Sequence, residues 1–220
     1  MKRLIYLILL ISYGALGKTW YADNGKQEGN GTLISPWGYL FAFDGADGQI
    51  QPLDTVTLLA GEYGYLTVTK AYSDWVTYKG IDAKFISTSE GDADHSGVIV
   101  VNGGEYIRFL DLIIEGQNPF RDDRNEGYQG ISSGFDLKSG KYIDIIGCSI
   151  SNVSGSGIYK AVLCSNLNAI GNQIKYCGYY SEKAGRYAHH GMYIQNWEGG
   201  YCNIEKNIIC LLYTSDAADE

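Results

Sequence analysis

A pattern of strands and turns is written twice between residues 134 and 178, and this repeat constrains the fold more than any other feature. The first copy reads GFDLKSGKYIDIIGCSISNVSG and the second reads GIYKAVLCSNLNAIGNQIKYCG. Both hold short runs in which apolar and polar residues alternate, the period of two that is typical of β-strands. Both end in Gly, Asn or Ser, which favour turns. The stretch is therefore one supersecondary unit, repeated.

The same unit recurs on both sides of this stretch. Its first apolar anchor falls on Ile107, Ile143, Leu167 and Cys202, with spacings of 36, 24 and 35 residues. A spacing near 24 is typical of one coil of a β-solenoid, and the longer spacings are one coil plus an insertion of about a dozen residues. Stacked coils bury a continuous core that no single coil can bury alone.

The alternation also predicts which side chains face outward. Phe135 and Leu137 are expected in the core, as are Ile158, Met192 and Ile194, because successive strand residues point to opposite sides. The outward row on the same strands then comprises Asp136, Lys138, Tyr159, Tyr193 and Gln195. Strands are expected near residues 55–60, 98–101, 106–114, 135–138, 142–150, 158–163, 167–174 and 191–196.

The first seventeen residues, MKRLIYLILLISYGALG, resemble a secretory signal. Lys2 and Arg3 precede an apolar run at residues 4–11, and small residues follow before Gly17. The run is too short for a comfortable membrane span. We expect cleavage near Gly17, no membrane span in the mature chain, and a secreted, periplasmic or cell-surface location.

The net charge and the length of the chain limit the classes of partner and the number of domains that we expect. The formal net charge is −8, which disfavours nucleic acid. Roughly 200 mature residues are enough for one domain, which we expect to be a monomer.

Four cysteines lie in or beside the repeat but not at equivalent positions, so buried thiols are favoured over a disulfide framework. Their disulfide state stays open. These are Cys148, Cys164, Cys177 and Cys202.

The last eleven residues, CLLYTSDAADE at positions 210–220, have a different origin by our interpretation. They are the translation of a DNA string that resembles the end of a transposon-derived sequencing adapter. A native acidic tail is the alternative. We expect the β-helix domain to cover residues 18–209, to be truncated at its C-terminal end, and to exclude this tail.

The segments before and after the repeat carry a family resemblance. The chain shows Thr19-Trp20-Tyr21, then GNGT at 29–32, SPW at 35–37, DTVTLLAGEY at 54–63 and HHGMYIQN at 189–196. These segments resemble secreted right-handed parallel β-helix proteins of the pectate-lyase-like superfamily, although Leu53 stands where Gly is usual. The resemblance implies an all-β, single-stranded right-handed parallel β-helix. A short helix through Trp37, Leu40 and Phe41, capped by Ser35-Pro36, is expected to cover the first coil.

Two insertions occupy equivalent places in the repeat, at residues 117–133 and 178–190. The coil between them has only a short turn, so we expect the two insertions to border a cleft. Functional residues of repeat folds concentrate on such insertions. Both are rich in charge, with Arg121, Asp122, Asp123 and Arg124 in the first and Glu182, Lys183, Arg186, His189 and His190 in the second.

The resemblance implies a polysaccharide lyase that cleaves an acidic, uronic-acid polymer by β-elimination. A base removes the proton next to the carboxylate, and a cation neutralises the developing charge. His190, Lys183 and Arg186 are the candidate bases, and Asp122 and Asp123 are candidate ligands for Ca²⁺. Candidate substrate-binding residues are Arg121, Arg124, Lys138, Tyr159, His189, Tyr193 and Gln195.

Two other classes stay open. A glycoside hydrolase of the same fold is weaker, because paired carboxylates are not evident on the outward row, where Asp136 stands alone. A non-catalytic carbohydrate-binding solenoid is the other alternative, with Tyr159, Tyr179, Tyr180 and Tyr193 available to stack on sugars. The charged insertions are also compatible with ordinary solvated loops, and a fold alone does not choose among these functions.

Overall fold

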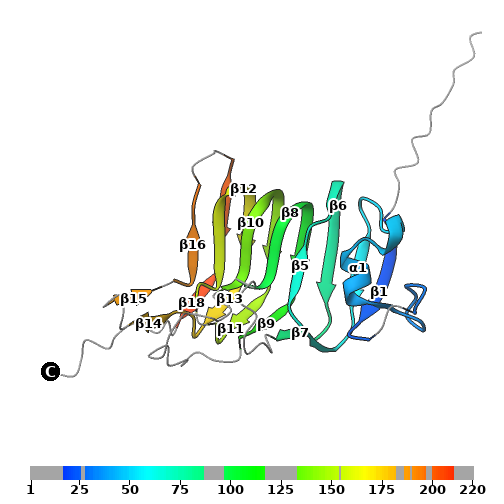
Figure 1. Cartoon of the computed structure of the whole chain (residues 1–220), viewed down its shortest axis with the longest axis horizontal. Coiled ribbons are helices and arrows are strands. Elements are labelled where there is room, and N and C mark those ends of the chain that lie inside the picture. The colour runs from blue at the N-terminus through cyan, green and yellow to red at the C-terminus, as the bar shows by residue number, and fades with distance from the viewer. Residues whose placement is uncertain are drawn as a thin grey trace, which may run out of the picture.

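The computed structural model describes residues 17–25, 28–86, 97–116, 133–153, 155–181, 186–188, 190–196 and 200–210. The chain winds as a parallel β-helix whose coils stack along the long axis of the molecule (Figure 1). All pairings between described strands are parallel apart from one short hairpin. The predicted all-β, parallel β-helix is confirmed.

Three long strands form the centre of a ten-stranded sheet: β8 (Gly97–Leu110), β10 (Ser133–Ile146) and β12 (Ile158–Ile170). Each strand bends in the middle, so it contributes to two faces of the β-helix. On the first face, β8 pairs with β5 (Leu66–Val68) and β12 pairs with β16 (Met192–Ile194). On the second face, the same strands pair with β6 (Ala71–Gly80) and β17 (Cys202–Glu205).

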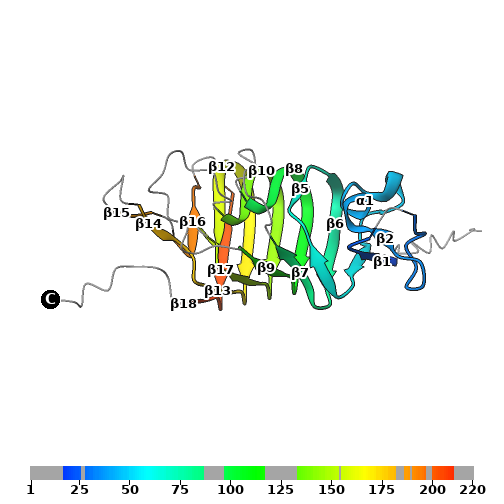
Figure 2. The ribbon, with the colours of Figure 1, turned by 60° about the horizontal axis from the view of Figure 1, so that its bottom comes forward.

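The third face is a separate six-stranded sheet that runs along the bottom of Figure 1 and is turned toward the viewer in Figure 2. Its strands are short and parallel, and each follows a second-face strand of the same coil. In spatial order they are β18 (Ile208–Cys210), β13 (Gln173–Lys175), β11 (Ser149–Ser151), β9 (Ile113–Glu115), β7 (Ala83–Ile86) and β4 (Gly61–Tyr63).

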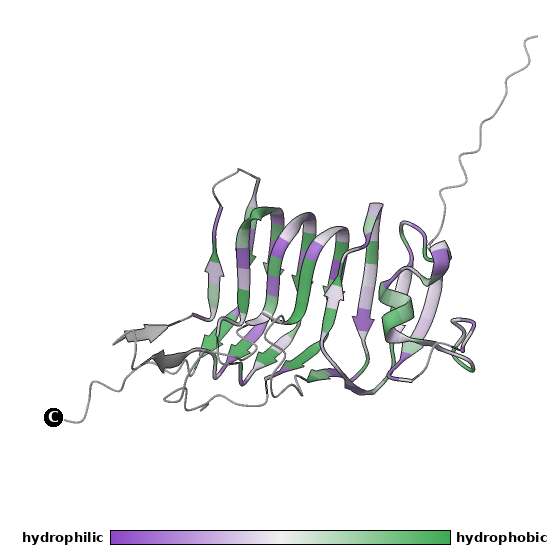
Figure 3. Cartoon of the chain, viewed as in Figure 1, coloured by the Kyte–Doolittle hydropathy of each residue, from purple (hydrophilic) through white to green (hydrophobic). Residues whose placement is uncertain are grey.

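The strand register confirms the repeat found in the sequence. Ile107 is paired with Ile143, Ile143 with Leu167, and Leu167 with Cys202. On the third face, Ile150 lies between Ile114 and Ile174 in the same way. The columns are buried except in the last coil, where Ile204 and Ile209 are exposed. Apolar residues thus alternate with polar ones along the strands (Figure 3).

Residues with positive φ make the corners of each coil. Asp111, Gly147, Gly171 and Lys206 each follow a second-face strand with φ between 55° and 66°. The predicted strands 106–114, 142–150 and 167–174 run through three of these corners, and the observed strands end there instead. The backbone turns in the left-handed region, which interrupts the ladder and moves the inward positions on by one residue, from Phe109 to Leu112 and from Ile145 to Cys148.

An asparagine ladder reinforces this corner in the later coils. Asn172 is fully buried, and its side-chain amide donates hydrogen bonds to Ile145 O and to Asn207 Oδ1, each with a length of 2.9 Å. Its own Oδ1 accepts a hydrogen bond from Cys148 N at 2.9 Å. Buried polar groups are stable only when their hydrogen bonds are made, and these bonds tie three coils together.

The N-terminal coil differs from the expectation in detail. Trp37 belongs to β2 (Trp37–Gly38), which pairs with β1 (Thr19–Asp23), and β1 pairs with β3 (Thr55–Leu58). The helix α1 (Tyr39–Phe43) begins after Gly38, which is extended and makes no side-chain cap. The predicted cap at Ser35-Pro36 is therefore wrong, because strand pairing holds Trp37 in an extended conformation. A 3₁₀ turn, η1 (Ala46–Gly48), follows.

The two insertions join the third face to the first face of the next coil. The second contains the antiparallel hairpin of β14 (Tyr179–Ser181) and β15 (Arg186–Ala188), whereas residues 117–132 of the first lie outside the described residues. Residues 1–16 of the predicted signal at 1–17 also lie outside them, as do residues 211–220 of the predicted tail at 210–220, whose first residue, Cys210, ends β18. No helix among the described residues is long and apolar enough to span a membrane.

Candidate functional site

The outward row of the first face crosses three neighbouring coils. Asp136 of β10 pairs with Tyr159 of β12, which pairs with Tyr193 of β16. The flanking residues Phe135 and Leu137 belong to the core, so alternation puts the row on the outer side. Asp136 is only 3% exposed, whereas Tyr193 is 40% exposed. The row therefore passes from a buried carboxylate to an open aromatic ring.

Three rings continue the row in parallel. The rings of Tyr159 and Tyr193 stack with centroids 5.6 Å apart and planes inclined by 8°. The imidazole of His190 stacks on Tyr193 at 5.8 Å and 9°. The backbone N of His190 donates to Ser156 Oγ at 3.4 Å. His190 is exposed, so its ring is accessible at the end of this stack.

Burial raises the pKa of the Tyr159 hydroxyl, and the neighbouring Asp136 carboxylate and Tyr193 add to the rise. A phenol beside a carboxylate keeps its proton, because a second negative charge there is unfavourable. Tyr159 therefore presents a hydrogen-bond donor at neutral pH. Sugar hydroxyl and carboxylate oxygens are suitable acceptors for this donor.

Two further predicted substrate-binding residues flank the row. Lys138 is half-buried and lies where the register of β10 shifts against both neighbouring strands. Such β-bulges re-aim a side chain next to functional surfaces. Gln195 is half-buried at the end of β16, where its backbone N donates to Lys160 O at 2.9 Å. The structure thus brings both residues to the same face as the tyrosines.

Lys160 is a buried residue that the sequence reasoning did not single out. It occupies the core column of Leu137 and Ile194 and is fully buried. Its amine donates to Gln195 O at 2.6 Å and to Asn196 Oδ1 at 3.4 Å. The alternation with Ile158 indicates its inward position, but its charge made it an improbable core residue.

The remaining predicted site residues are not placed. Arg121, Asp122, Asp123, Arg124, Lys183 and His189 lie outside the described residues. Arg186 begins β15, and its side chain also lies outside them. Among the residues that the structure does describe, no three His, Cys, Asp or Glu side chains come together as a metal site. A Ca²⁺ site therefore stays a prediction that depends on Asp122 and Asp123.

Comparison with known proteins supports the fold. No protein-family model matches the chain, and no curated protein is similar in sequence. Among solved structures, the chain is similar to the crystal structure of pectate lyase Pel9A, with a TM-score of 0.63 and 16% sequence identity. The match covers 88% of this chain and 48% of that one, so the chain spans about half the length of that lyase. At this identity, the likeness shows a shared parallel β-helix fold.

Proposed function

We propose that this chain acts on a polysaccharide, and that it is a lyase cleaving a uronic-acid polymer by β-elimination. The observation that carries the proposal is the row Asp136, Tyr159 and Tyr193 with His190 stacked at its end. The rings and hydroxyl groups of Tyr159 and Tyr193 lie on successive coils and suit a chain-like ligand laid across the strands, whereas Asp136 is buried. The fold that the chain shares with pectate lyase Pel9A supports this choice of substrate class.

In the proposed reaction, a base takes the proton from the carbon next to the uronate carboxylate. The electron pair forms a carbon–carbon double bond as the glycosidic C–O bond breaks, and the leaving sugar oxygen gains a proton. His190 is exposed beside the tyrosines and is our first choice for the base. Lys183 and Arg186 stay alternative bases, while Arg121, Arg124, Lys138 and His189 are proposed to contact the substrate carboxylates.

Ca²⁺ would supply neutralisation of the developing charge when bound. Its proposed ligands are Asp122 and Asp123, and Ca²⁺ needs six or more oxygen ligands. Asp136 is a buried carboxylate of β10, the strand that follows this insertion in the sequence. Addition of a chelator and then of Ca²⁺ during the assay tests this part of the proposal separately.

The test is a panel of polymers. The protein is incubated with polygalacturonate, alginate and neutral glycans, and two signals are followed: ultraviolet absorbance of the unsaturated product and new reducing ends. A lyase yields both signals on a uronate polymer. Reducing ends without absorbance would indicate the hydrolase instead. The absence of both signals would favour the carbohydrate-binding protein.

The carbohydrate-binding alternative is favoured by one specific observation. Tyr159, Tyr193 and His190 form a continuous parallel stack, whose rings carry hydroxyl and N–H groups at their edges. Such a row suits polar recognition of a glycan without any chemistry. Retention on uronate polymers in affinity electrophoresis, without product, would support this alternative.

A further inference from the structure

A second row of side chains lies at the bend between the first and second faces. Each member directly precedes a second-face anchor residue, and these anchors are paired in register from one coil to the next. We call these residues the bend row. Along the axis they are Trp75, Tyr106, Tyr142, Asn166 and Tyr201. Four of the five are aromatic, and all five are at least partly exposed.

The backbone at this bend does not require aromatic residues. Tyr106, Tyr142 and Asn166 have φ of 57°, 56° and 56°. This left-handed conformation is unfavourable for bulky side chains and is tolerated best by Asn and Gly. Asn166 shows that the same turn forms with a residue type that adopts the left-handed conformation more readily. Bulky residues kept in an unfavourable backbone conformation indicate a role for their rings.

The rings leave one aromatic face beside a small residue. Tyr106 and Tyr142 stack with centroids 4.4 Å apart and planes inclined by 18°, and Trp75 meets Tyr106 edge-on at 5.9 Å. Beyond Tyr142, the next member of the row is Asn166, whose Oδ1 accepts from Tyr201 N at 3.1 Å. Tyr142 therefore has a ring neighbour on one side and only an amide in the bend row on the other.

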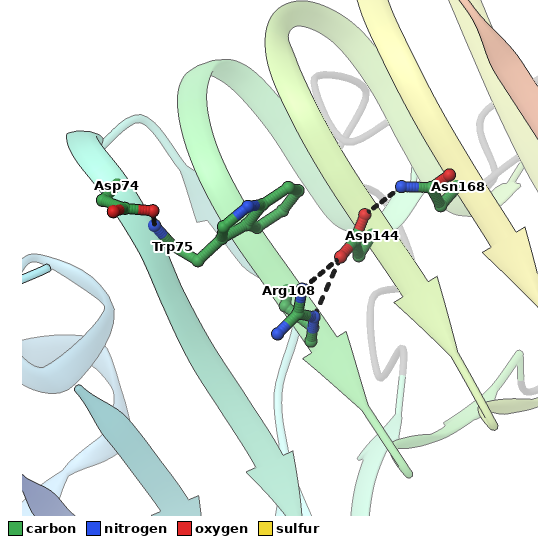
Figure 4. Close-up of polar contacts among 5 residues, drawn as sticks. All are labelled: Asp74, Trp75, Arg108, Asp144 and Asn168. Atoms are coloured by element: carbon green, nitrogen blue, oxygen red, sulfur yellow. Dashed lines mark hydrogen bonds and ion pairs between the residues drawn. The ribbon is translucent and has the colours of Figure 1, made fainter. Parts of the chain in front are cut away.

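A polar row runs beside the bend row on the second face (Figure 4). Arg108 donates through Nε to Asp144 Oδ2 at 2.9 Å and lies 4.8 Å above the ring of Trp75. Asn168 donates to Asp144 Oδ1 at 2.6 Å. The Asp144 side chain is 4% exposed and that of Arg108 is 33% exposed. The buried Asp144 carboxylate holds Arg108 and Asn168 in place, and their planar guanidinium and amide groups are partly exposed at the surface.

The charges in and beside these rows are paired. Arg108 of the polar row is paired with Asp144, and Lys141 and Glu105, which precede Tyr142 and Tyr106, lie 3.8 Å apart. An acidic polymer would therefore meet cations that already have carboxylate partners. A neutral ligand loses nothing by this pairing, and its hydroxyl groups can bond to guanidinium and amide edges.

We propose that the bend row and its neighbouring polar row bind a neutral, extended polysaccharide lying along the β-helix axis. Coils repeat at about 4.8 Å, so the row presents similar groups at regular intervals to a linear polymer. Aromatic surfaces pack against the C–H side of sugar rings, and the polar row binds their hydroxyl groups. This site is separate from the first-face row and does not depend on lyase activity.

The test is calorimetric titration of the full chain with cellohexaose, xylohexaose and mannohexaose, with polygalacturonate as the acidic comparison. The key variant is Tyr142→Asn, which keeps a residue suited to the left-handed backbone and removes the ring. Tyr176→Asn is the matched control, because Tyr176 also has positive φ, 53°, and is 39% exposed, but follows β13 of the third face. Thermal unfolding of each variant verifies the fold.

We expect at least one neutral hexasaccharide to bind, with affinity reduced about tenfold in Tyr142→Asn and unchanged in Tyr176→Asn. Trp75→Leu is expected to show the same loss, and it decides the question if Tyr142→Asn does not fold. The proposal is overturned if no neutral hexasaccharide binds, if only polygalacturonate binds, or if the ring variants bind as well as the wild type. An equal loss in the Tyr176 control would also overturn it.

Discussion

The amine of Lys160 lies 2.6 Å from the carbonyl oxygen of Gln195, inside a column of otherwise aliphatic core residues. Gln195 is thus held twice by one residue, because its N–H also donates to the carbonyl oxygen of Lys160. The described β16 ends at Ile194. The amine satisfies a backbone acceptor beside the point where this strand ends.

Replacement of Lys160 tests that contact. Lys160→Met keeps most of the volume and leaves Gln195 O without the amine, which is expected to cost about 1–3 kcal/mol of unfolding free energy. Lys160→Ala adds a cavity and should cost clearly more. Urea denaturation measures both. Equal stability of Lys160→Met and wild type would show that the hydrogen bond to Gln195 contributes nothing.

The asparagine ladder gives a second prediction. Asn172→Leu removes the acceptor for Cys148 N and two donors, and leaves polar groups unpaired in the core. We expect a loss of about 2–4 kcal/mol, more than a single unsatisfied group costs. Leu112 occupies the equivalent corner beside Cys148 and is fully buried, so leucine itself is compatible with the corner. A loss below that of Lys160→Met would contradict the ladder's importance.

The third prediction concerns a glycine at the start of the first face. A Cβ on Gly157 would meet the γ2 methyl of Ile174 at 2.5 Å and Gly191 O at 2.7 Å. Gly157→Ala should therefore destabilise the chain by about 1–3 kcal/mol through overpacking. Gly171→Asn is the control, because Gly171 has φ of 66° and open space around it. If both variants unfold at the same urea concentration, close packing at Gly157 is not limiting.

The buried thiols predict a loss of stability at alkaline pH. Burial raises the pKa of Cys148 and of Cys177 from 9.0 to about 12, and that of Cys164 to about 11. Below pH 9 these thiols are protonated in both states and add no pH dependence. Above it, only the unfolded chain ionises, so the unfolding free energy falls by about 1.4 kcal/mol per pH unit for each thiol. The loss continues until pH passes the folded pKa.

Urea denaturation at several pH values between 8 and about 10.5 measures that slope. Cys148→Ala removes one of the three thiols and is expected to make the slope shallower by at most about 1.4 kcal/mol per pH unit, since buried tyrosines with raised pKa values, such as Tyr63 and Tyr78, contribute the rest near pH 10. A slope that does not change in this variant would mean that Cys148 ionises equally in both states.

The repeat was predictable because each coil depends on the same few apolar positions. The anchors Ile107, Ile143, Leu167 and Cys202 are in register as predicted. The strand β6 was missed, although Val76 and Tyr78 carry the same pattern 31 residues before Ile107 and Phe109. Its coil has a different length, and a search for the later spacings passes over it.

The site was predictable only in part. Alternation places Asp136, Tyr159 and Tyr193 in one outward row, and the register agrees. The bend row was not predicted, because Tyr106, Tyr142 and Asn166 at its centre are in the left-handed conformation, which follows no period of two. Nor does periodicity reveal that Lys160 finds a carbonyl acceptor in the next coil, since that acceptor comes from a chain segment 35 residues away.

We propose that the first-face row binds a uronic-acid polymer for cleavage at His190. The most direct measurement is the rate of unsaturated product formation by the wild type, Tyr193→Ala and Tyr176→Asn on the same polymer. We predict product from the wild type and the Tyr176 variant at equal rates, and a rate at least about tenfold lower for Tyr193→Ala. No unsaturated product from any uronate polymer, or equal rates for all three proteins, would contradict the account.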